Sequence, residues 1–216
     1  MDNLDIYEDI LDHTENYRKK SLIPVKSMNE LFRDLTLAQL TKENLEDIGF
    51  NKEEKRFSAL LEGYDYKKIL KKYKYVDLMT KILDEFKPIR KEPYKKLAKA
   101  VFASAKYLIK FPDFENYKKH LALRCNNEEH TFEFLDQFRL NASIPAMLFN
   151  KTCLFFQRSG LLDVPYVSLA SKRFFMDEYN YPNNNAEIYQ AMVSLAKDNH
   201  IRCYELNDRL ESYYSE

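Results

Sequence analysis

Residues 144–175 read Ile-Pro-Ala-Met-Leu-Phe-Asn-Lys-Thr-Cys-Leu-Phe-Phe-Gln-Arg-Ser-Gly-Leu-Leu-Asp-Val-Pro-Tyr-Val-Ser-Leu-Ala-Ser-Lys-Arg-Phe-Phe, a pattern that predicts a turn followed by two helices. Pro145 favours a tight turn, and the apolar spacing predicts a helix over residues 150–159. Gly160 is expected to end that helix, because glycine readily takes the left-handed conformation found just after helices. Pro165 is expected to begin a second helix, over about residues 165–179.

The length and composition indicate a folded protein with a core. The chain has 216 residues, of which 45% are hydrophobic, so it is long enough to bury a core and is not of the disordered class. No apolar run approaches the roughly 20 residues that a membrane span needs, and the acidic N-terminus lacks a signal-peptide core. We therefore expect a cytoplasmic protein without a membrane partner.

Few residues of the chain suit metal, disulfide or phosphate-loop chemistry. Three glycines are too few for a glycine-rich phosphate loop. The three cysteines are odd in number and widely spaced, which indicates reduced thiols. The histidines show no ligand spacing with the cysteines, so neither a metal site nor a cofactor is expected. These residues are Cys125, Cys153 and Cys203, and His13, His120, His130 and His200.

Charge is concentrated in the middle of the chain. Residues 67–119 hold 16 Lys/Arg and 6 Asp/Glu, although the whole chain has a formal net charge of zero. Such a segment is typical of a face that binds polyanions, and equally of solvated helix faces that pair with acidic segments. Its densest part predicts phosphate contacts and base stacking, or else lysines lying over a tyrosine-lined core. This part contains Lys67, Lys68, Lys71, Lys72 and Lys74, interleaved with Tyr64, Tyr66, Tyr73 and Tyr75.

Helical periodicity runs along the chain, and strand-like alternation is absent from residues 1–88. We therefore expect an all-α fold, with an N-terminal helical region over residues 1–88 and a second helical region over residues 89–216. Pro93 is expected near the first position of the strongest helix, and Gly49 just after the end of an earlier one. The expected helix starts are marked by Ser27 with Glu30, Thr36 with Gln39, Asn51 with Glu54, Asp65, Asp113, and Asn126 or Asn127.

The central stretch resembles the helix-hairpin-helix DNA glycosylase superfamily, especially its lysine-bearing glycosylase/lyases. Residues 146–150 occupy the hairpin position, and Lys151 leads the helix that follows. Residues 163–167 resemble the apolar approach to the family's catalytic aspartate, and Arg173-Phe174 resembles the next helix. The pattern covers about 30 residues, and roughly residues 90–200 with flanking helices. It implies a DNA-acting protein of base-excision repair, a hydrolase or lyase.

Two departures from the family pattern concern its chemistry. The hairpin glycines, which let backbone N–H groups approach a DNA phosphate, are replaced by Met147 and Phe149. The catalytic aspartate position falls on Ser168, whose hydroxyl cannot act as a carboxylate base. The resemblance therefore leaves open a relative without glycosylase activity that binds nucleic acid or a protein partner.

The resemblance assigns Lys151 as the nucleophile that forms a Schiff base with the sugar of a flipped nucleotide. This role requires a lowered lysine pKa, which burial or a neighbouring cation can produce. The alternatives are an ordinary surface lysine at a helix start, and a helical interaction protein whose likeness to the family is accidental. The neighbouring cations would be Arg158, Lys172 and Arg173, which are also candidate nucleic-acid contacts. The carboxylates that could replace the family's missing aspartate are Asp163 and Asp177.

Overall fold

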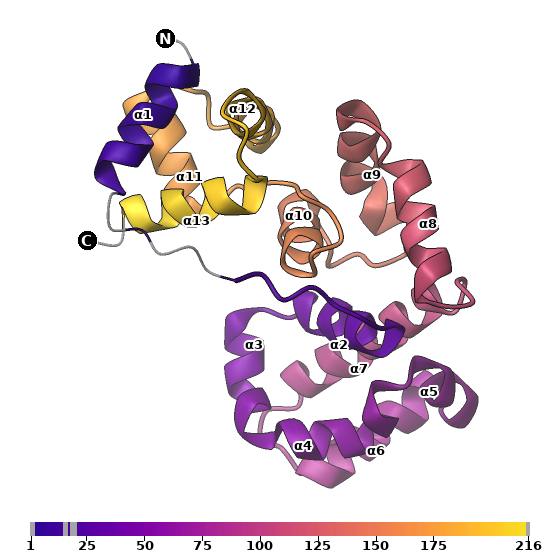
Figure 1. Ribbon diagram of the computed structural model, residues 1–216. Helices are drawn as coiled ribbons and strands as arrows, with labels where there is room; N and C mark the ends of the chain where they lie inside the picture. The colour runs from indigo at the N-terminus through magenta and orange to yellow at the C-terminus, as the bar shows by residue number, and fades with distance from the viewer. Residues whose placement is uncertain (1–2, 15–16, 18–20, 215–216) are drawn as a thin grey trace. The chain divides into compact units, whose positions relative to one another are not determined.

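The computed structural model describes residues 3–14, 17 and 21–214, and all regular secondary structure in these residues is helical (Figure 1). The expected all-α class is therefore confirmed. The chain divides into two compact units, of which unit 1 joins residues 1–24 to residues 153–216 and unit 2 comprises residues 25–152. This grouping differs from the expected division at residue 88, because α6 and α7, on either side of that position, pack against each other in unit 2.

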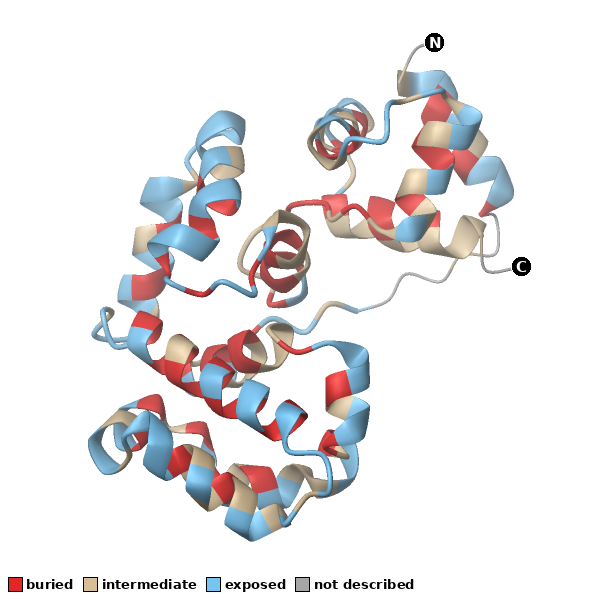
Figure 2. Ribbon diagram, turned by 180° about the vertical axis from the view of Figure 1, so that it is seen from behind, coloured by how far each residue is buried: buried red, intermediate tan, exposed pale blue. Residues whose placement is uncertain are grey.

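Unit 2 is built around α7 (Glu92–Leu108), on which α2, α5 and α6 all pack. Figure 2 shows buried positions along most of this helix. Small residues such as Ala98, Ser104 and Ala105 are fully buried there, so neighbouring helices approach its backbone closely. The other elements of unit 2 are α2 (Met28–Ala38), α3 (Lys42–Asp47), α4 (Phe50–Leu60), the 3₁₀ turn η1 (Glu62–Tyr64), α5 (Tyr66–Lys72), α6 (Tyr75–Phe86), α8 (Phe114–Arg124) and α9 (Glu128–Asn141).

Unit 1 joins the N-terminal helix to the C-terminal helices. The Asn3 amide donates to Ser194 Oγ at 3.0 Å, and the Tyr179 hydroxyl donates to Asp9 at 2.9 Å. Both bonds span more than 160 residues of sequence, which helical periodicity cannot reveal. The unit contains α1 (Asn3–His13), α11 (Leu169–Arg173), the π-helical turn η2 (Phe174–Glu178), α12 (Asn185–Asp198) and α13 (Cys203–Tyr213), and the boundary between the units falls inside α10 (Phe149–Arg158).

The helix expected from Pro165 begins four residues later, at Leu169. The side-chain amide of Asn207 pairs with both backbone groups of Tyr166, since its Oδ1 accepts from the Tyr166 N–H at 3.0 Å and its Nδ2 donates to the Tyr166 carbonyl at 2.7 Å. A residue whose N–H and C=O are both bonded in this way is not free to enter a helix. The expected start was therefore wrong, and Ser168 caps the helix instead.

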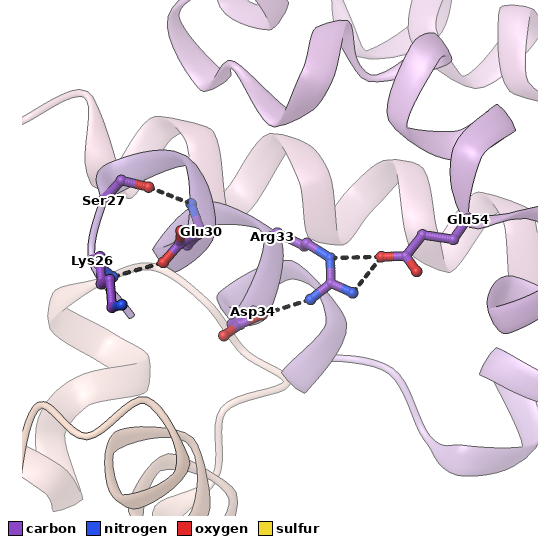
Figure 3. Close-up of polar contacts among 6 residues, drawn as sticks. All are labelled: Lys26, Ser27, Glu30, Arg33, Asp34 and Glu54. Carbon is purple, nitrogen blue, oxygen red and sulfur yellow. Dashed lines mark hydrogen bonds and ion pairs between the residues drawn. The ribbon is translucent and has the colours of Figure 1, made fainter. Parts of the chain in front are cut away.

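Side-chain caps set most of the remaining helix starts. Ser27 Oγ accepts from the Glu30 N–H at 3.2 Å, and the Glu30 carboxylate accepts from the Lys26 N–H at 2.7 Å (Figure 3). Arg33, on the same helix, donates to Asp34 and to Glu54 of α4, which links two helices of unit 2. The caps expected at Ser27, Asp65, Asp113 and Asn127 are all confirmed.

Two expected caps are not used. Thr36 lies inside α2 and is buried, and the break falls at Thr41, which caps α3. Asn51 lies inside α4, which begins after Gly49. Gly49 follows the end of α3 with a φ of 61°, as expected for a residue that ends a helix.

Gly160 and Gly49 form a matched pair for a stability test. Both have a positive φ, at 67° and 61°, so both substitutions to alanine add left-handed strain of about 1 kcal/mol. A Cβ on Gly160 would also lie 2.6 Å from Pro24 Cβ, whereas nothing lies within 4 Å at Gly49. We expect Gly160→Ala to lose about 2–4 kcal/mol of unfolding free energy and Gly49→Ala about 1 kcal/mol, measured by urea unfolding. Equal losses would contradict the close approach.

Candidate functional site

Lys151 lies in the first turn of α10 and is half-buried. Its Nζ donates to the backbone carbonyl of Gln39 at 3.2 Å. Burial lowers the pKa of Lys151 below its ordinary value, and desolvation is the cause. The lowered lysine pKa that a nucleophile role requires is therefore present, and its cause is burial and not a neighbouring cation.

Gln39, the acceptor of that bond, is the centre of a polar junction at the end of α2. Its side-chain Nε2 lies 2.7 Å from Ser104 Oγ, 3.2 Å from the Ala100 carbonyl and 3.1 Å from the Leu35 carbonyl. The two amide protons of Gln39 are shared among these three acceptors. The acceptor of Lys151 is instead the backbone carbonyl of Gln39. Lys151 thus satisfies a carbonyl at the end of a helix, which is a structural use of its ammonium group.

The turn before Lys151 is filled by apolar side chains. Met147 is fully buried, and the ring of Phe149 packs on Phe132 with 5.2 Å between centroids. The Met147 N–H donates to the Ile144 carbonyl at 3.0 Å, and its carbonyl accepts from the Thr152 hydroxyl at 3.1 Å. The backbone of Met147 is therefore engaged within the turn.

Ser168 and Asp163 both act at helix starts in unit 1. Ser168 Oγ accepts from the Ser171 N–H at 3.0 Å, so the serine at the family's aspartate position is the N-cap of α11. Asp163 is exposed, accepts from the Tyr204 N–H at 3.4 Å in the first turn of α13 and pairs with Arg202 at 3.5 Å. These contacts explain a serine and an aspartate at these positions without any catalytic role.

The predicted nucleic-acid contacts divide between the two units. Arg158, Lys172 and Arg173 belong to unit 1, where Lys172 donates to Asn183 at 3.3 Å and Arg173 is exposed. Asp177 is also exposed in unit 1. The five lysines of residues 67–74 belong to unit 2 and are all exposed. The structure therefore groups the five lysines in one unit, and the three other cations in the other.

The lysines of α5 lie beside the second half of α7. Lys67 Nζ donates to the Pro112 carbonyl at 3.1 Å, just beyond the end of α7. At the start of α6, the Tyr75 ring meets the edge of Phe102 at 5.9 Å between centroids. Lys99 and Lys106 are three and four residues from Phe102 on α7, so they project from the same side of that helix. We call the resulting group the lysine surface, consisting of Lys67, Lys68, Lys71, Lys72, Lys74, Lys99 and Lys106.

Part of the lysine surface is neutralised by local carboxylates. Lys72 pairs with Glu62 at 2.6 Å and Lys68 pairs with Asp65 at 3.5 Å. Lys71, Lys74, Lys99 and Lys106 are exposed and take part in no ion pair with any residue that the structure describes. Sequence spacing identified the first two, but Lys99 and Lys106 join them only through the packing of α5 and α6 on α7.

The tyrosines between these lysines are mostly used inside the fold. Tyr64 and Tyr66 are buried, and the Tyr73 hydroxyl lies between Glu62 and Lys81. Only Tyr75 among the four is exposed, and its ring already contacts Phe102. The prediction that these tyrosines line the core is therefore confirmed for Tyr64 and Tyr66. Little ring surface is left for stacking on bases.

No family model, curated protein or solved structure matches the chain. Within residues 3–14, 17 and 21–214, no helix has the length and apolarity needed to cross a membrane. The same residues contain no group of three or more His, Cys, Asp or Glu side chains arranged to hold a metal ion.

The contact between Glu62 and Lys72 predicts a pH-dependent stability. Hydrogen bonds from Lys72 and Tyr73 hold the pKa of Glu62 below its ordinary value of 4.5. A carboxyl with a lowered folded-state pKa stabilises the fold above about pH 4.5, and this contribution disappears as the pH falls through the folded-state pKa. We expect Glu62→Gln to lose less stability than wild type between about pH 5 and pH 3 in urea unfolding. Parallel curves of unfolding free energy against pH for the two proteins would contradict the contact between Glu62 and Lys72.

Proposed function

We propose that this protein binds nucleic acid through phosphate contacts made by the lysine surface of unit 2. The observation that carries the proposal is a set of four exposed lysines, Lys71, Lys74, Lys99 and Lys106, on α5, at the start of α6 and on α7, which pack together, none of them in an ion pair with a described residue. Helix α5 supports it, because it contains four lysines and no acidic residue. Clustered, uncompensated cations attract a phosphate backbone and release its counterions on binding.

The lysine surface is suited to contact the phosphate backbone of a nucleic acid, and less suited to recognise its bases. Sequence-specific recognition needs side chains that reach base edges, and single-strand binding needs exposed aromatic platforms. Tyr64 and Tyr66 are buried and Tyr73 is held by Glu62 and Lys81, so the surface offers ammonium groups with few rings. The proposed binding is therefore independent of sequence and prefers a duplex to an unstructured single strand.

Salt dependence tests this proposal. Four phosphate contacts predict a slope of about −3.6 for the logarithm of the duplex association constant against the logarithm of salt concentration. We expect the double variant Lys71→Gln/Lys106→Gln to reduce that slope to about −1.8, because each lost lysine removes one phosphate contact. Fluorescence anisotropy with a labelled duplex of mixed sequence measures both slopes.

The matched control is Lys52→Gln/Lys55→Gln. These two lysines are exposed on α4 of the same unit and are not part of the lysine surface, so the charge change is equal while the position differs. The control is expected to keep the wild-type slope. An equal effect of both double variants, or no duplex binding by the wild type at about 50 mM salt, would refute the lysine surface as the site.

A second candidate function is the lyase chemistry that the family resemblance implies. The observation in its favour is the burial that lowers the pKa of Lys151, since a neutral amine is needed to attack a sugar carbon. Against it stands the Gln39 carbonyl, which already accepts from the Lys151 ammonium. The two candidates differ in what happens at an abasic site.

Borohydride trapping on duplex DNA with an abasic site separates the candidates. Because Lys151 is half-buried and bonded to Gln39, we expect the wild type to form no more covalent adduct than Lys151→Ala. Denaturing gel electrophoresis measures the adduct, and an established lyase serves as the positive control. An adduct that forms with the wild type and disappears in Lys151→Ala would establish Lys151 as a nucleophile and overturn this expectation.

A further inference from the structure

Unit 2 contains a polar pocket that shares no residue with the lysine surface. It lies between the last turn of α8, the loop that follows and one side of α9, two consecutive helices in Figure 1, and its volume is about 250 Å³. Sites for drug-sized ligands are larger, at roughly 300–1,000 Å³, and mostly apolar, so this pocket suits a smaller and more hydrophilic molecule. Its polar lining consists of Arg124, Asn126, His130, Glu133, Gln137 and Asn141.

One side of α9 supplies most of the polar lining. Its residues follow one another at intervals of three or four along the helix, so they share a face, and all of them are exposed. Phe134 also lines the pocket, is only 9% exposed and forms an apolar floor. The polar groups are therefore held on a regular helix beside a buried ring. They are His130, Glu133, Gln137 and Asn141.

The loop between α8 and α9 holds the His130 ring in one orientation. The ring Nδ1 lies 2.6 Å from Asn126 Oδ1, and the His130 backbone N–H donates to Asn127 Oδ1 at 2.8 Å. Because the Asn126 oxygen can only accept, the proton of the neutral ring is on Nδ1, and Nε2 is an acceptor. No residue within the described ranges bonds Nε2. His130 thus brings an acceptor of fixed position to the lining of the pocket.

Four further side chains of the lining are not used by the fold. Arg124, Glu133, Gln137 and Asn141 form no hydrogen bond or ion pair with any residue that the structure describes. The guanidinium only donates, the carboxylate only accepts, and the two carboxamides do both. The two formal charges cancel, so an anionic ligand is repelled by Glu133 and a cationic one by Arg124. A ligand that satisfies the whole lining is therefore neutral, and its groups both donate and accept.

From this pocket we infer a binding site for a neutral pyranose, either a free monosaccharide or the terminal ring of a glycan. Each hydroxyl of such a ring donates and accepts, and adjacent hydroxyls fit the two-atom edges of a carboxylate, a guanidinium and a carboxamide. Glu133 and His130 Nε2 accept from the ring hydroxyls. Arg124 donates to them, and Gln137 does both. The C–H face of the ring covers Phe134 and removes apolar surface from water.

The size of the pocket favours one ring over a chain. An extended peptide is also neutral and both donates and accepts, but it presents one N–H and one C=O for every 3.3 Å or so of its length. A pocket of about 250 Å³ encloses only a short piece of such a chain. A pyranose brings several hydroxyls into the same small volume, so more of the polar lining is satisfied by one molecule.

Titration of the ¹⁵N-labelled full chain, followed by heteronuclear NMR, tests the inference. The probes are the methyl glycosides of D-glucose, D-galactose, D-mannose and N-acetyl-D-glucosamine. We expect at least one of them to shift the side-chain amide signals of Gln137 and Asn141. The matched ligand is 2-methoxytetrahydropyran, which keeps the ring and lacks the hydroxyls, and it is expected to bind at least tenfold more weakly.

The free sugar that corresponds to the best glycoside separates the two sources of the ring. Equal affinity of the two assigns the site to the terminal ring of a glycan, because the anomeric oxygen is then free to carry a further residue. Binding of the free sugar alone assigns the site to a monosaccharide.

Two variants with the same charge change test the position of the site. Glu133→Gln is expected to weaken binding about tenfold, because charge-assisted hydrogen bonds to the ring are lost. Asp136→Asn is the matched control, since Asp136 is exposed on the same helix and does not line the pocket. It is expected to keep the wild-type affinity, and the backbone amide spectra of both variants verify that they are folded.

Any of three results overturns the inference. The first is no binding of the four glycosides or their free sugars at concentrations up to about 20 mM. The second is equal weakening by Glu133→Gln and Asp136→Asn, because the affinity then depends on general charge. The third is binding of glycine or of N-acetyl-triglycine amide as tight as that of the best sugar, which assigns the pocket to a zwitterion or to a peptide backbone. None of these results bears on the lysine surface, which the salt dependence of duplex binding tests separately.

Discussion

Buried irregular backbone must have its N–H and C=O groups bonded, and in this chain side-chain amides meet that requirement. In unit 1, Asn207 pairs with both backbone groups of Tyr166, and Gln157 bonds the Val164 carbonyl. In unit 2, the Gln39 side-chain amide donates to carbonyls of α2 and α7, and the Gln39 backbone carbonyl accepts from the Lys151 ammonium. The start of α11 after Ser168 follows from the Asn207 amide, which holds the backbone of Tyr166 outside a helix.

Local sequence signals predicted what depends on neighbours in the chain. Caps at Ser27, Asp65 and Asp113 were found because the donor and acceptor lie three residues apart. The helix expected from Pro165 failed because its competitor, Asn207, lies 41 residues from Tyr166. The pairing of α1 with the last helices and the addition of Lys99 and Lys106 to the lysine surface depend on tertiary packing, which no local period encodes.

Three of the residues that carried the family resemblance have structural roles in the fold. Lys151 bonds a carbonyl at the end of α2, Ser168 caps α11, and Met147 fills the core of a turn. A lysine, a serine and apolar turn residues at this spacing are therefore explained by helix termini and packing alone. The burial of Lys151 beside Gln39 also lowers its pKa, so the contact with Gln39 and the lowered pKa have one physical cause. A covalent measurement is needed to distinguish a structural lysine from a nucleophile.

The formal net charge of zero conceals two units of opposite charge. Unit 2 contains 25 Lys/Arg and 19 Asp/Glu, and unit 1 contains 9 and 15, which gives formal charges of +6 and −6. The excess cations of unit 2 include the exposed lysines of the lysine surface. Unit 2 therefore favours phosphate groups electrostatically, whereas unit 1 disfavours them. Because the proposed phosphate contacts would be made by exposed side chains, added salt is expected to weaken them.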